Sequence, residues 1–511
     1  MAAQIHTVAF RGVEAIPVEV QVRMSTGLPA FTLVGLPDKA VAESRERVRA
    51  AMDAIGLGLP PKRITVNLAP ADVPKEGSHF DLPIALGLMV ALNVIPADAA
   101  AKYVALGELA LDGRLAPVVG ILPAALSAAE QKRGLICPDA CGAEAAWSGL
   151  GEREGGGILA ALSLIQIVNH FKGTQMLSDP KPGIPQDEAP APDLADVRGQ
   201  EMARRALEVA AAGGHNLLMI GPPGAGKSML ASRLPGILPP MTADEILQSS
   251  IVSSLAGEMT TGAMRRTRAF RAPHHSASMA AMVGGGTRAR PGEISLAHLG
   301  VLFLDELPEF SRPVLDCLRQ PVETGEVTVA RVNAHITYPA RFQMVAAMNP
   351  CRCGFAGDAE RGCSRQPRCL QDYQTRISGP LLDRFDIRIE VPPVQLSEMT
   401  TATPGEASAV VAARVKQARA RQEARYQDAL PGLRLNAMAD GERLRRLAPL
   451  DEEGKKLMDK VAAEKSLTAR GYHRVLRLAL TLADMDNAPE LGHKHLAEAL
   501  AWRGGAVGVM Q

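Results

Sequence analysis

The sequence of 511 residues has little net charge, few cysteines and no long apolar run. Because the net charge is +1, no overall field draws the chain to nucleic acid or anionic lipid, and any contact with a polyanion must come from local patches. No stretch approaches the roughly 18 to 20 apolar residues of a membrane-spanning helix, and the N-terminus lacks the charged-then-apolar order of a signal peptide. Seven cysteines in so long a chain do not suit a disulfide framework. These absences predict a cytoplasmic protein with no membrane segment.

A proline-rich stretch divides the chain. The string DPKPGIPQDEAPAPD has five prolines and several acids, with hardly any large apolar residue. Such a segment cannot bury enough apolar surface to fold, so we expect an extended linker. The predicted organisation is an N-terminal domain at 1–173, a linker at 174–196, a core domain at 197–393 and a helical region at 394–511.

Apolar periodicity predicts an α/β fold before the linker and a second one after it. The expected N-terminal strands are 18–27, 31–36 and 63–70, and the expected helices are 39–56 and 81–95. In the core, apolar strand-like runs alternate with helices, which predicts a doubly wound parallel sheet. Those runs are 215–220, 301–304 and 342–348. Beyond Pro393 the pattern predicts a helical lid, with amphipathic stretches at 408–428, 451–464 and 469–487.

Residues 221–228 read GPPGAGKS and fit the phosphate-loop pattern G-x-x-x-x-G-K-[ST]. In this motif backbone amides surround a polyphosphate, the lysine reaches the outer phosphates and the hydroxyl binds Mg²⁺. The strand-like run 215–220 precedes the loop and a helix-like run at 228–234 follows it, which is the order that the motif requires. The predicted nucleotide-binding residues are Gly221, Pro222, Pro223, Gly224, Ala225, Gly226, Lys227 and Ser228.

Residues 301–306 read VLFLDE, four apolar residues followed by two carboxylates. A buried strand that ends in this pair beside a phosphate loop supplies Asp305, which binds Mg²⁺ directly or through one of its ligands, and Glu306, a carboxylate that polarises the attacking water. Together the two motifs predict ATP hydrolysis with Mg²⁺.

Longer strings carry a resemblance to a family. After the two motifs come MVAAMN, ending at Asn349, then LLDRFD and a helical tail, the order typical of AAA+ ATPases. RAPHHSAS, GGGTRARPGEISLAHLGVLFLDELPEF and VEVQVRMSTGLPAFTLVGLPDKAVAESRERVRAA resemble the YifB/ComM family of magnesium-chelatase-like AAA+ ATPases. The resemblance covers nearly the whole chain.

The resemblance implies roles for three further polar residues. Asn349 matches sensor 1, which orients the lytic water; the alternative is a strand-end asparagine that caps a turn. Arg384 matches the arginine finger, which completes the site of a neighbouring subunit and therefore implies a ring, expected to be a hexamer. Arg376 could share that role. Arg470 matches sensor 2 in the lid, with Arg474 and Arg477 as weaker alternatives.

Local basic segments suggest contact with DNA. Arg268 and Arg271 lie in MRRTRAFRAPHH, an arginine-rich part of an insertion between the two nucleotide motifs. Residues 326–339 alternate apolar and polar residues and predict a hairpin. Related ring ATPases point such a hairpin into the pore, and the alternative is a solvated hairpin without a ligand. The predicted DNA-binding residues are Arg331, Asn333, His335, Arg268, Arg271 and Arg352.

Four cysteines lie in NPCRCGFAGDAERGCSRQPRCL, a stretch that is rich in glycine and arginine. Four thiolates could bind Zn²⁺ and fold a loop that has no apolar core. The spacing differs from the C-x₂-C of common zinc knuckles, so free surface thiols are the alternative. The candidate ligands are Cys351, Cys353, Cys363 and Cys369.

The N-terminal domain resembles the Lon protease catalytic fold as this family has it. PKEGSHFDLPIA places His79 near the position of the protease serine, with Ser78 beside it, and VVGIL places Leu122 where the protease has its lysine. Without that base the hydroxyl cannot be activated, so no peptidase activity is expected.

Taken together, the family resemblance implies a hexameric ATPase that encircles DNA and drives branch migration during natural transformation. One rival is a chelatase-type ring that remodels a protein partner, and a weaker one is an unfoldase that serves a protease. An unfoldase is expected to present an aromatic pore residue, and ARVNAHITY has none before Tyr338.

Overall fold

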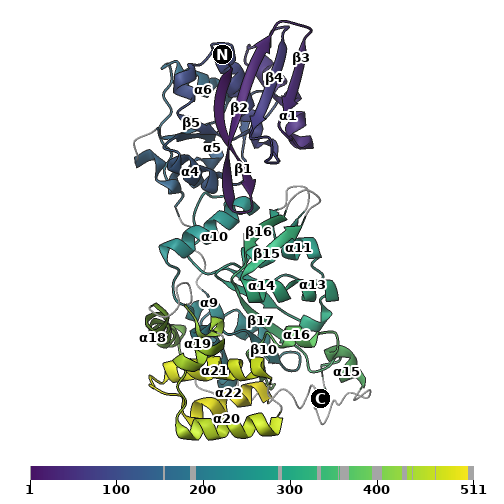
Figure 1. The fold of residues 1–511 in the computed structure, drawn as a ribbon, viewed down its shortest axis with the longest axis vertical. Helices are drawn as coiled ribbons and strands as arrows, with labels where there is room; N and C mark the ends of the chain where they lie inside the picture. Colours follow the sequence, from purple (N-terminus) through teal and green to yellow (C-terminus); the bar gives the residue numbers. More distant parts are fainter. Residues whose placement is uncertain are drawn as a thin grey trace.

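The computed structural model describes most of the chain. It leaves out Met1 and residues 153–155, 185–190, 286–289, 331–334, 355, 357–367, 394–404, 428–433, 440, 466–467 and 505–511. Figure 1 shows the N-terminal domain above the core, with the C-terminal helices below it. None of the helices in the described part of the chain is long and apolar enough to cross a membrane.

The N-terminal domain is built on a seven-stranded mixed sheet with the order β3-β4-β2-β1-β5-β8-β9. Its strands are β1 (Ala3–Arg11), β2 (Glu14–Ser25), β3 (Ala30–Val34), β4 (Arg63–Ala69), β5 (Tyr103–Ala105), β8 (Gly134–Pro138) and β9 (Ile158–Ala161). The helices include α1 (Lys39–Ala54), α2 (Asp81–Ala91), α4 (Ile121–Glu130), α5 (Asp139–Ala145) and α6 (Leu164–Phe171). The predicted α/β class is confirmed.

Helix α2 is the central helix of this domain because nearly all of its side chains are apolar and buried. Its first residue is the buried carboxylate Asp81, which accepts hydrogen bonds from Arg47 at 2.6 and 2.9 Å and from the Leu109 amide at 3.1 Å. A buried charge is tolerated only with such partners.

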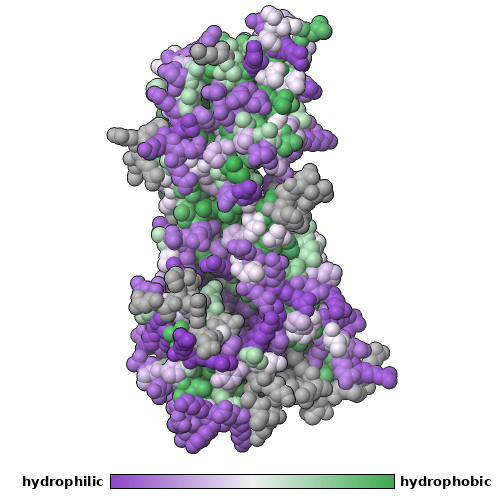
Figure 2. Space-filling model, in the orientation of Figure 1, coloured by the Kyte–Doolittle hydropathy of each residue, from purple (hydrophilic) through white to green (hydrophobic). Residues whose placement is uncertain are grey.

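Polar residues cover much of the face of the molecule that Figure 2 shows.

The core holds a five-stranded sheet with the order β11-β14-β17-β10-β18, all parallel. The strands are β10 (Leu217–Ile220), β11 (Phe270–Arg271), β14 (Val301–Leu304), β17 (Gln343–Met348) and β18 (Ile387–Glu390). β10, β14 and β17 are buried along their whole length, as expected for parallel strands covered on both faces. The doubly wound parallel sheet is therefore confirmed.

The C-terminal region is helical, as predicted, and shares one hydrophobic core with the sheet. Its helices are α18 (Ser408–Gln427), α19 (Gly441–Leu447), α20 (Glu452–Lys465), α21 (Ala469–Met485) and α22 (His493–Gly504). A buried histidine joins the two layers: His215 contacts Asp386 at 3.2 Å through Nδ1 and Thr481 of α21 at 2.8 Å through Nε2.

The proline-rich stretch has no helix or strand in its described residues before η4 (Leu194–Asp196). It is attached to the N-terminal domain: Asp179 accepts a hydrogen bond from the Ile158 amide at 2.5 Å, and the Gly183 amide donates to Ala143 at 3.2 Å. Extended chain is expected from its composition, but its attachment depends on partners that composition does not reveal.

Helix α10 (Ala243–Ala256) lies between the two globular parts (Figure 1). The Gly120 amide donates to the Ser254 carbonyl at 3.2 Å, and the Trp147 indole donates to Gly262 at 2.9 Å. The N-terminal domain therefore rests on an element of the core, in addition to the covalent link.

Candidate nucleotide site

The phosphate loop connects β10 to the short helix α8 (Lys227–Ala231). Gly226 precedes the helix with φ +84°, a left-handed conformation that favours glycine. The loop opens into a pocket of about 400 Å³ at the carboxyl edge of the sheet. Its lining residues are Pro223, Gly224, Ala225, Gly226, Lys227, Ser228, Met229, Asp305, Glu306, Met348 and Asn349.

Lys227 is mostly buried at the base of this pocket. Its ammonium donates to the carbonyls of Gly221 and Pro222 at 2.8 and 2.9 Å and to Asn349 Oδ1 at 3.2 Å. Burial lowers the pKa of Lys227, and the nearby carboxylates of Asp305 and Glu306 oppose that shift. Since β10 and β17 are neighbours, Asn349 at the end of β17 lies beside the loop.

The two carboxylates directly follow β14. Ser228 Oγ donates to Asp305 Oδ2 at 2.6 Å, so a hydroxyl and a carboxylate oxygen lie together. Such hard oxygen ligands suit Mg²⁺. Glu306 has φ +51°, a conformation that is uncommon for a residue other than glycine and is associated with functional sites.

One residue of this site was not predicted. His275 Nδ1 lies 3.2 Å from Glu306 Oε2, and its ring packs against that of His274 with centroids 4.1 Å apart. His275 comes after β11, which pairs in parallel with β14. Both strands therefore end at the same edge of the sheet, and His275 lies near Glu306. β11 has only two residues, too few for a periodic pattern.

The segment that enters the core lies next to the phosphate loop. Gln200 donates to the Pro392 carbonyl at 2.7 Å and to the Ala225 carbonyl at 3.4 Å, and Val197 is fully buried. Gln200 thereby joins the loop to the chain that leaves β18.

The predicted arginines do not line the pocket. Arg384 pairs with Glu323 and donates to the Pro380 carbonyl at 2.6 Å. Arg376 pairs with Glu309 at 3.0 Å. Arg470 is exposed in the first turn of α21, so within one chain the structure keeps both the finger candidate and the lid candidate outside the pocket.

Two arginines predicted to bind DNA are engaged inside the fold. Arg268 donates to the Pro239 and Leu299 carbonyls at 2.8 and 2.7 Å and pairs with Glu245 at 2.9 Å. Arg271 pairs with Glu293 at 2.7 Å and with Glu258 at 3.2 Å. Their cationic pattern in the sequence did not reveal these partners, and we leave both out of the DNA proposal below.

The predicted hairpin is present as β15 (Glu326–Ala330) and β16 (His335–Pro339). Arg331 and Asn333 lie outside the described residues, and of His335 only its backbone position in β16 is described. Arg352 is exposed in the cysteine-rich segment.

The thiols of Cys351, Cys353 and Cys369 lie within 4.8 Å of one another. Cys363, the fourth predicted ligand, lies outside the described residues. The described residues of the segment therefore bring together three of the four candidate zinc ligands.

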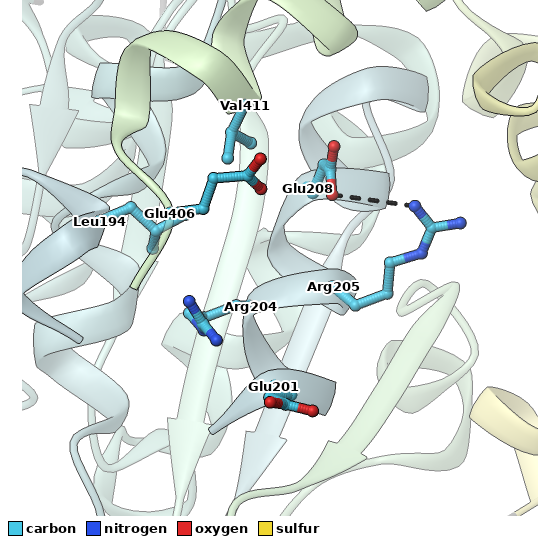
Figure 3. A pocket seen from close by; sticks show the side chains of 7 residues that line it. All are labelled: Leu194, Glu201, Arg204, Arg205, Glu208, Glu406 and Val411. Atoms are coloured by element: carbon cyan, nitrogen blue, oxygen red, sulfur yellow. Dashed lines mark ion pairs between the residues drawn. The ribbon is translucent and has the colours of Figure 1, made fainter. Parts of the chain in front are cut away.

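A second pocket, of about 350 Å³, lies between α7 (Glu201–Gly213) and the start of α18 (Figure 3). Figure 3 shows Arg205 directed at Glu208, an ion pair of 3.8 Å. Arg414 pairs with both Glu208 and Glu406 at 2.6 and 2.5 Å. Arg414 therefore neutralises two of the three carboxylates that line this pocket.

In the N-terminal domain, Ser78 hydrogen-bonds Glu108, and His79 is buried against the Val8 carbonyl at 3.0 Å. The Leu122 side chain is buried, and its amide donates to Glu144 at 3.0 Å.

The strand order, the phosphate loop and the Asp-Glu pair define the class as an AAA+ domain. Comparison with known families gives three matches: "Magnesium chelatase, subunit ChlI" over residues 193–399, "Subunit ChlI of Mg-chelatase" over 19–141 and "Magnesium chelatase, subunit ChlI C-terminal" over 405–503. This family suggests ATPase activity with ATP and Mg²⁺.

Several relatives match along nearly their whole length. The YifB protein of Escherichia coli (strain K12) is 45% identical over 98% of this chain and 96% of its own, and competence protein ComM of Haemophilus influenzae is 44% identical over 98% and 97%. The magnesium-chelatase 38 kDa subunit of Rhodobacter capsulatus is 27% identical over 38% of this chain and 54% of its own. The chain belongs to the YifB/ComM family of magnesium-chelatase-like AAA+ proteins.

Proposed function

We propose that this chain is a cytoplasmic ATP-driven DNA motor, which forms a homo-hexameric ring and promotes branch migration when single-stranded DNA is integrated during natural transformation. The observation that carries the ATPase part is the Ser228–Asp305 contact of 2.6 Å beside Lys227 and Glu306. The DNA part is supported by the likeness to a competence protein over almost the whole chain.

In this proposal the phosphates of ATP lie along the phosphate loop, and Lys227 turns its ammonium from Asn349 and the loop carbonyls to the outer phosphates. Ser228 and Asp305 would hold Mg²⁺, which would supply positive charge beside the phosphates. Glu306 accepts a hydrogen bond from the attacking water, and Asn349 orients it. His275 keeps the Glu306 carboxylate in place.

Arg384 completes the site of the neighbouring subunit. Its side chain is only 10% exposed in one chain, where Glu323 and the Pro380 carbonyl hold it. A guanidinium supplied by the neighbour stabilises the charge that grows in the transition state, so hydrolysis depends on assembly.

DNA contact is assigned to the hairpin β15–β16, with Arg331, Asn333 and His335, and to Arg352. The hairpin packs with its apolar face on the core through Val327, Val329 and Ile336. Alongside ATP and Mg²⁺, we propose Zn²⁺ as a third bound species, on the thiols of Cys351, Cys353 and Cys369.

A second candidate function is a chelatase-type ring that remodels a protein partner, supported by the partial likeness to a magnesium-chelatase subunit. That likeness covers 38% of this chain, whereas the likeness to the competence protein covers 98%. We therefore prefer the DNA motor.

The test is ATPase activity of the full-length protein with and without forked or three-stranded DNA, followed by extension of strand exchange. We expect DNA to stimulate hydrolysis and salt to weaken its binding, because phosphate contacts release counterions. Lys227→Ala should remove hydrolysis and strand exchange together. If wild-type protein shows neither stimulation by DNA nor salt-sensitive binding, the DNA motor is wrong and the chelatase-type candidate takes its place.

A further inference from the structure

We infer that Zn²⁺ bound to Cys351, Cys353 and Cys369 acts as a clamp, which holds the turn after Asn349 against the phosphate loop and so sets the rate of ATP hydrolysis. This inference rests on the proposed ATPase function and adds a means of controlling that same site. Its basis is the place of the three thiols in the fold.

The thiols have a spacing that a metal can use. Cys351 Sγ and Cys353 Sγ are 3.1 Å apart, and all three sulfur atoms lie within 4.8 Å of one another without forming a disulfide. Tetrahedral Zn²⁺ with bonds of about 2.3 Å places its sulfur ligands about 3.8 Å apart. Small movements therefore suffice to complete the site.

Residues 351–354, which include the first two thiols, form a tight turn that packs on the phosphate loop. The Gly354 amide donates to the Cys351 carbonyl at 2.9 Å. Gly354 has φ +86°, and a Cβ atom there would come within 2.5 Å of the Pro223 ring. Backbone of the cysteine turn therefore packs directly on the phosphate loop, and any larger residue at 354 would push the two apart.

The third thiol comes from a helix that is attached to the same strand end. Cys369 lies in α15 (Arg368–Gln374), whose last residue, Gln374, donates to the Pro350 carbonyl at 3.3 Å. Tyr373 of this helix is buried, and burial raises the pKa of its hydroxyl to about 12. A metal on all three thiols would thus join two supports of Asn349, the turn and the helix.

A metal on the three thiols would also stabilise the fold here, because its binding free energy contributes directly to folding. The clamp keeps Asn349 close to Lys227, at the observed 3.2 Å.

The other cysteines provide controls. Burial raises the pKa of Cys137, Cys141 and Cys317, with Cys317 at about 12, which opposes the thiolate form that a metal needs. Cys317 is the last residue of α13 (Arg312–Cys317), and its thiol donates to the Val314 carbonyl at 3.0 Å. Cys317→Ser is thus a matched substitution outside the cluster.

The first experiment measures metal in the purified full-length protein by mass spectrometry. We expect about one zinc ion per chain in the wild type and in Cys317→Ser, and loss of most of it in Cys351→Ser and Cys369→Ser. Reconstitution with Co²⁺ should give the intense visible bands of tetrahedral thiolate coordination. Equal metal content in all four proteins, or thiols that are all free in the wild type, would overturn the site.

The second experiment measures basal ATPase activity and nucleotide binding, without DNA, before and after removal of the metal by a chelator that can reach the exposed Cys353. We expect kcat to fall roughly tenfold, because displacement of a positioning group by a fraction of an ångström costs about this much. Binding of a non-hydrolysable ATP analogue should change little, and amide exchange over residues 368–374 should become faster.

If zinc leaves and kcat is unchanged, the clamp is overturned even though the metal site exists. If the chelated protein loses activity while DNA has no effect on the wild type, the clamp stands and the DNA motor fails. The two proposals are therefore separable. Re-addition of Zn²⁺ should restore kcat in the wild type and in Cys317→Ser, but not in Cys351→Ser.

Discussion

At the scale of single residues, Glu306 is positioned by two features that do not depend on nucleotide. Its backbone has φ +51°, and its carboxylate lies 3.2 Å from His275 Nδ1. A carboxylate that must polarise water needs a fixed orientation, since proton transfer depends on geometry before basicity. His275 is therefore assigned as a positioning residue.

We predict that His275→Ala lowers kcat for ATP hydrolysis about tenfold and changes KM little, because His275 does not line the phosphate pocket. His275→Asn keeps a side-chain donor and should retain an intermediate rate. Steady-state kinetics on both variants provide the measurement. His274→Ala is the neighbouring control and should have the smaller effect. A higher KM at unchanged kcat would show that His275 serves binding instead.

Residues 223–228 of the phosphate loop, Asp305, Glu306 and Asn349 could be predicted from sequence because each chemical role demands particular residue types at a fixed spacing, and the structure brings them to one pocket. His275 could not, because its role depends on a two-residue strand next to β14. Arg268 and Arg271 show the opposite case: a basic run in sequence does not reveal which carboxylates the fold will supply.

At the scale of elements, the insertion between the nucleotide motifs owes its attachment to Arg268. This side chain is 9% exposed and joins three separate segments through Pro239, Leu299 and Glu245. Glu245 also completes the capping box at the start of α10 with Thr242. Arg268 thereby ties the helix beneath the N-terminal domain to the sheet.

We predict that Arg268→Ala lowers the free energy of unfolding by about 3 kcal/mol, since it leaves a mostly buried carboxylate without its partner. Arg352→Ala, at an exposed position, should change stability by less than about 0.5 kcal/mol. Denaturation curves give these values, and DNA titrations at several salt concentrations complete the comparison. Arg352→Ala should reduce the salt slope by about 1. Loss of DNA binding in a folded Arg268→Ala protein would contradict the structural assignment.

Two elements with clear patterns were predicted well: the amphipathic helix α18 was expected at 408–428 and spans Ser408–Gln427, and the apolar strand β14 lies at 301–304 as expected. The expected helix at 228–234 is instead divided into α8 and α9 (Leu234–Ile237). Pro235 in SRLPG lacks an amide donor, which favours a new helical start there over continuation. The ends of such short helices depend on single residues such as Pro235, and an apolar pattern taken over a longer window does not show them.

At the scale of the whole molecule, a buried carboxyl group lies where the two globular parts meet. Glu144 of α5 accepts hydrogen bonds from the Leu122 amide at 3.0 Å and from Ser254 of α10 at 2.5 Å. Burial raises the pKa of Glu144 above its ordinary value of 4.5, and the two hydrogen bonds oppose the shift. The protonated form is therefore the one that the interface favours.

We predict that Glu144→Gln removes a pH dependence of stability. Because the pKa of Glu144 is higher in the folded than in the unfolded protein, Glu144 adds to the free energy of unfolding at low pH. This added stability is fully present below pH 4.5 and is lost as pH rises through the folded pKa. Above that pKa Glu144→Gln should have a larger free energy of unfolding than wild type, by about 1.4 kcal/mol for each unit by which the pKa is raised, and it should melt at a higher temperature. Thermal melts from about pH 5 to pH 8 test this. Glu144→Ala, which loses both hydrogen bonds, should be less stable than Glu144→Gln throughout, and a wild type that gains stability over Glu144→Gln with rising pH would contradict the assignment.

The proposed ring makes the strongest prediction for Arg384. In one chain this guanidinium pairs with Glu323 and does not line the nucleotide pocket, so an essential role in hydrolysis requires a second subunit. Lys227→Ala has a defective site but an intact finger, and Arg384→Ala has an intact site but no finger. Each alone should hydrolyse almost no ATP, while Arg384→Ala should still bind it. An equal mixture should recover up to about a quarter of wild-type activity, because in a ring of head-to-tail contacts one neighbour pair in four joins an intact site to an intact finger. Activity that stays at the level of the separate variants, under conditions where mixed rings form, would place Arg384 in its own subunit's site or outside catalysis.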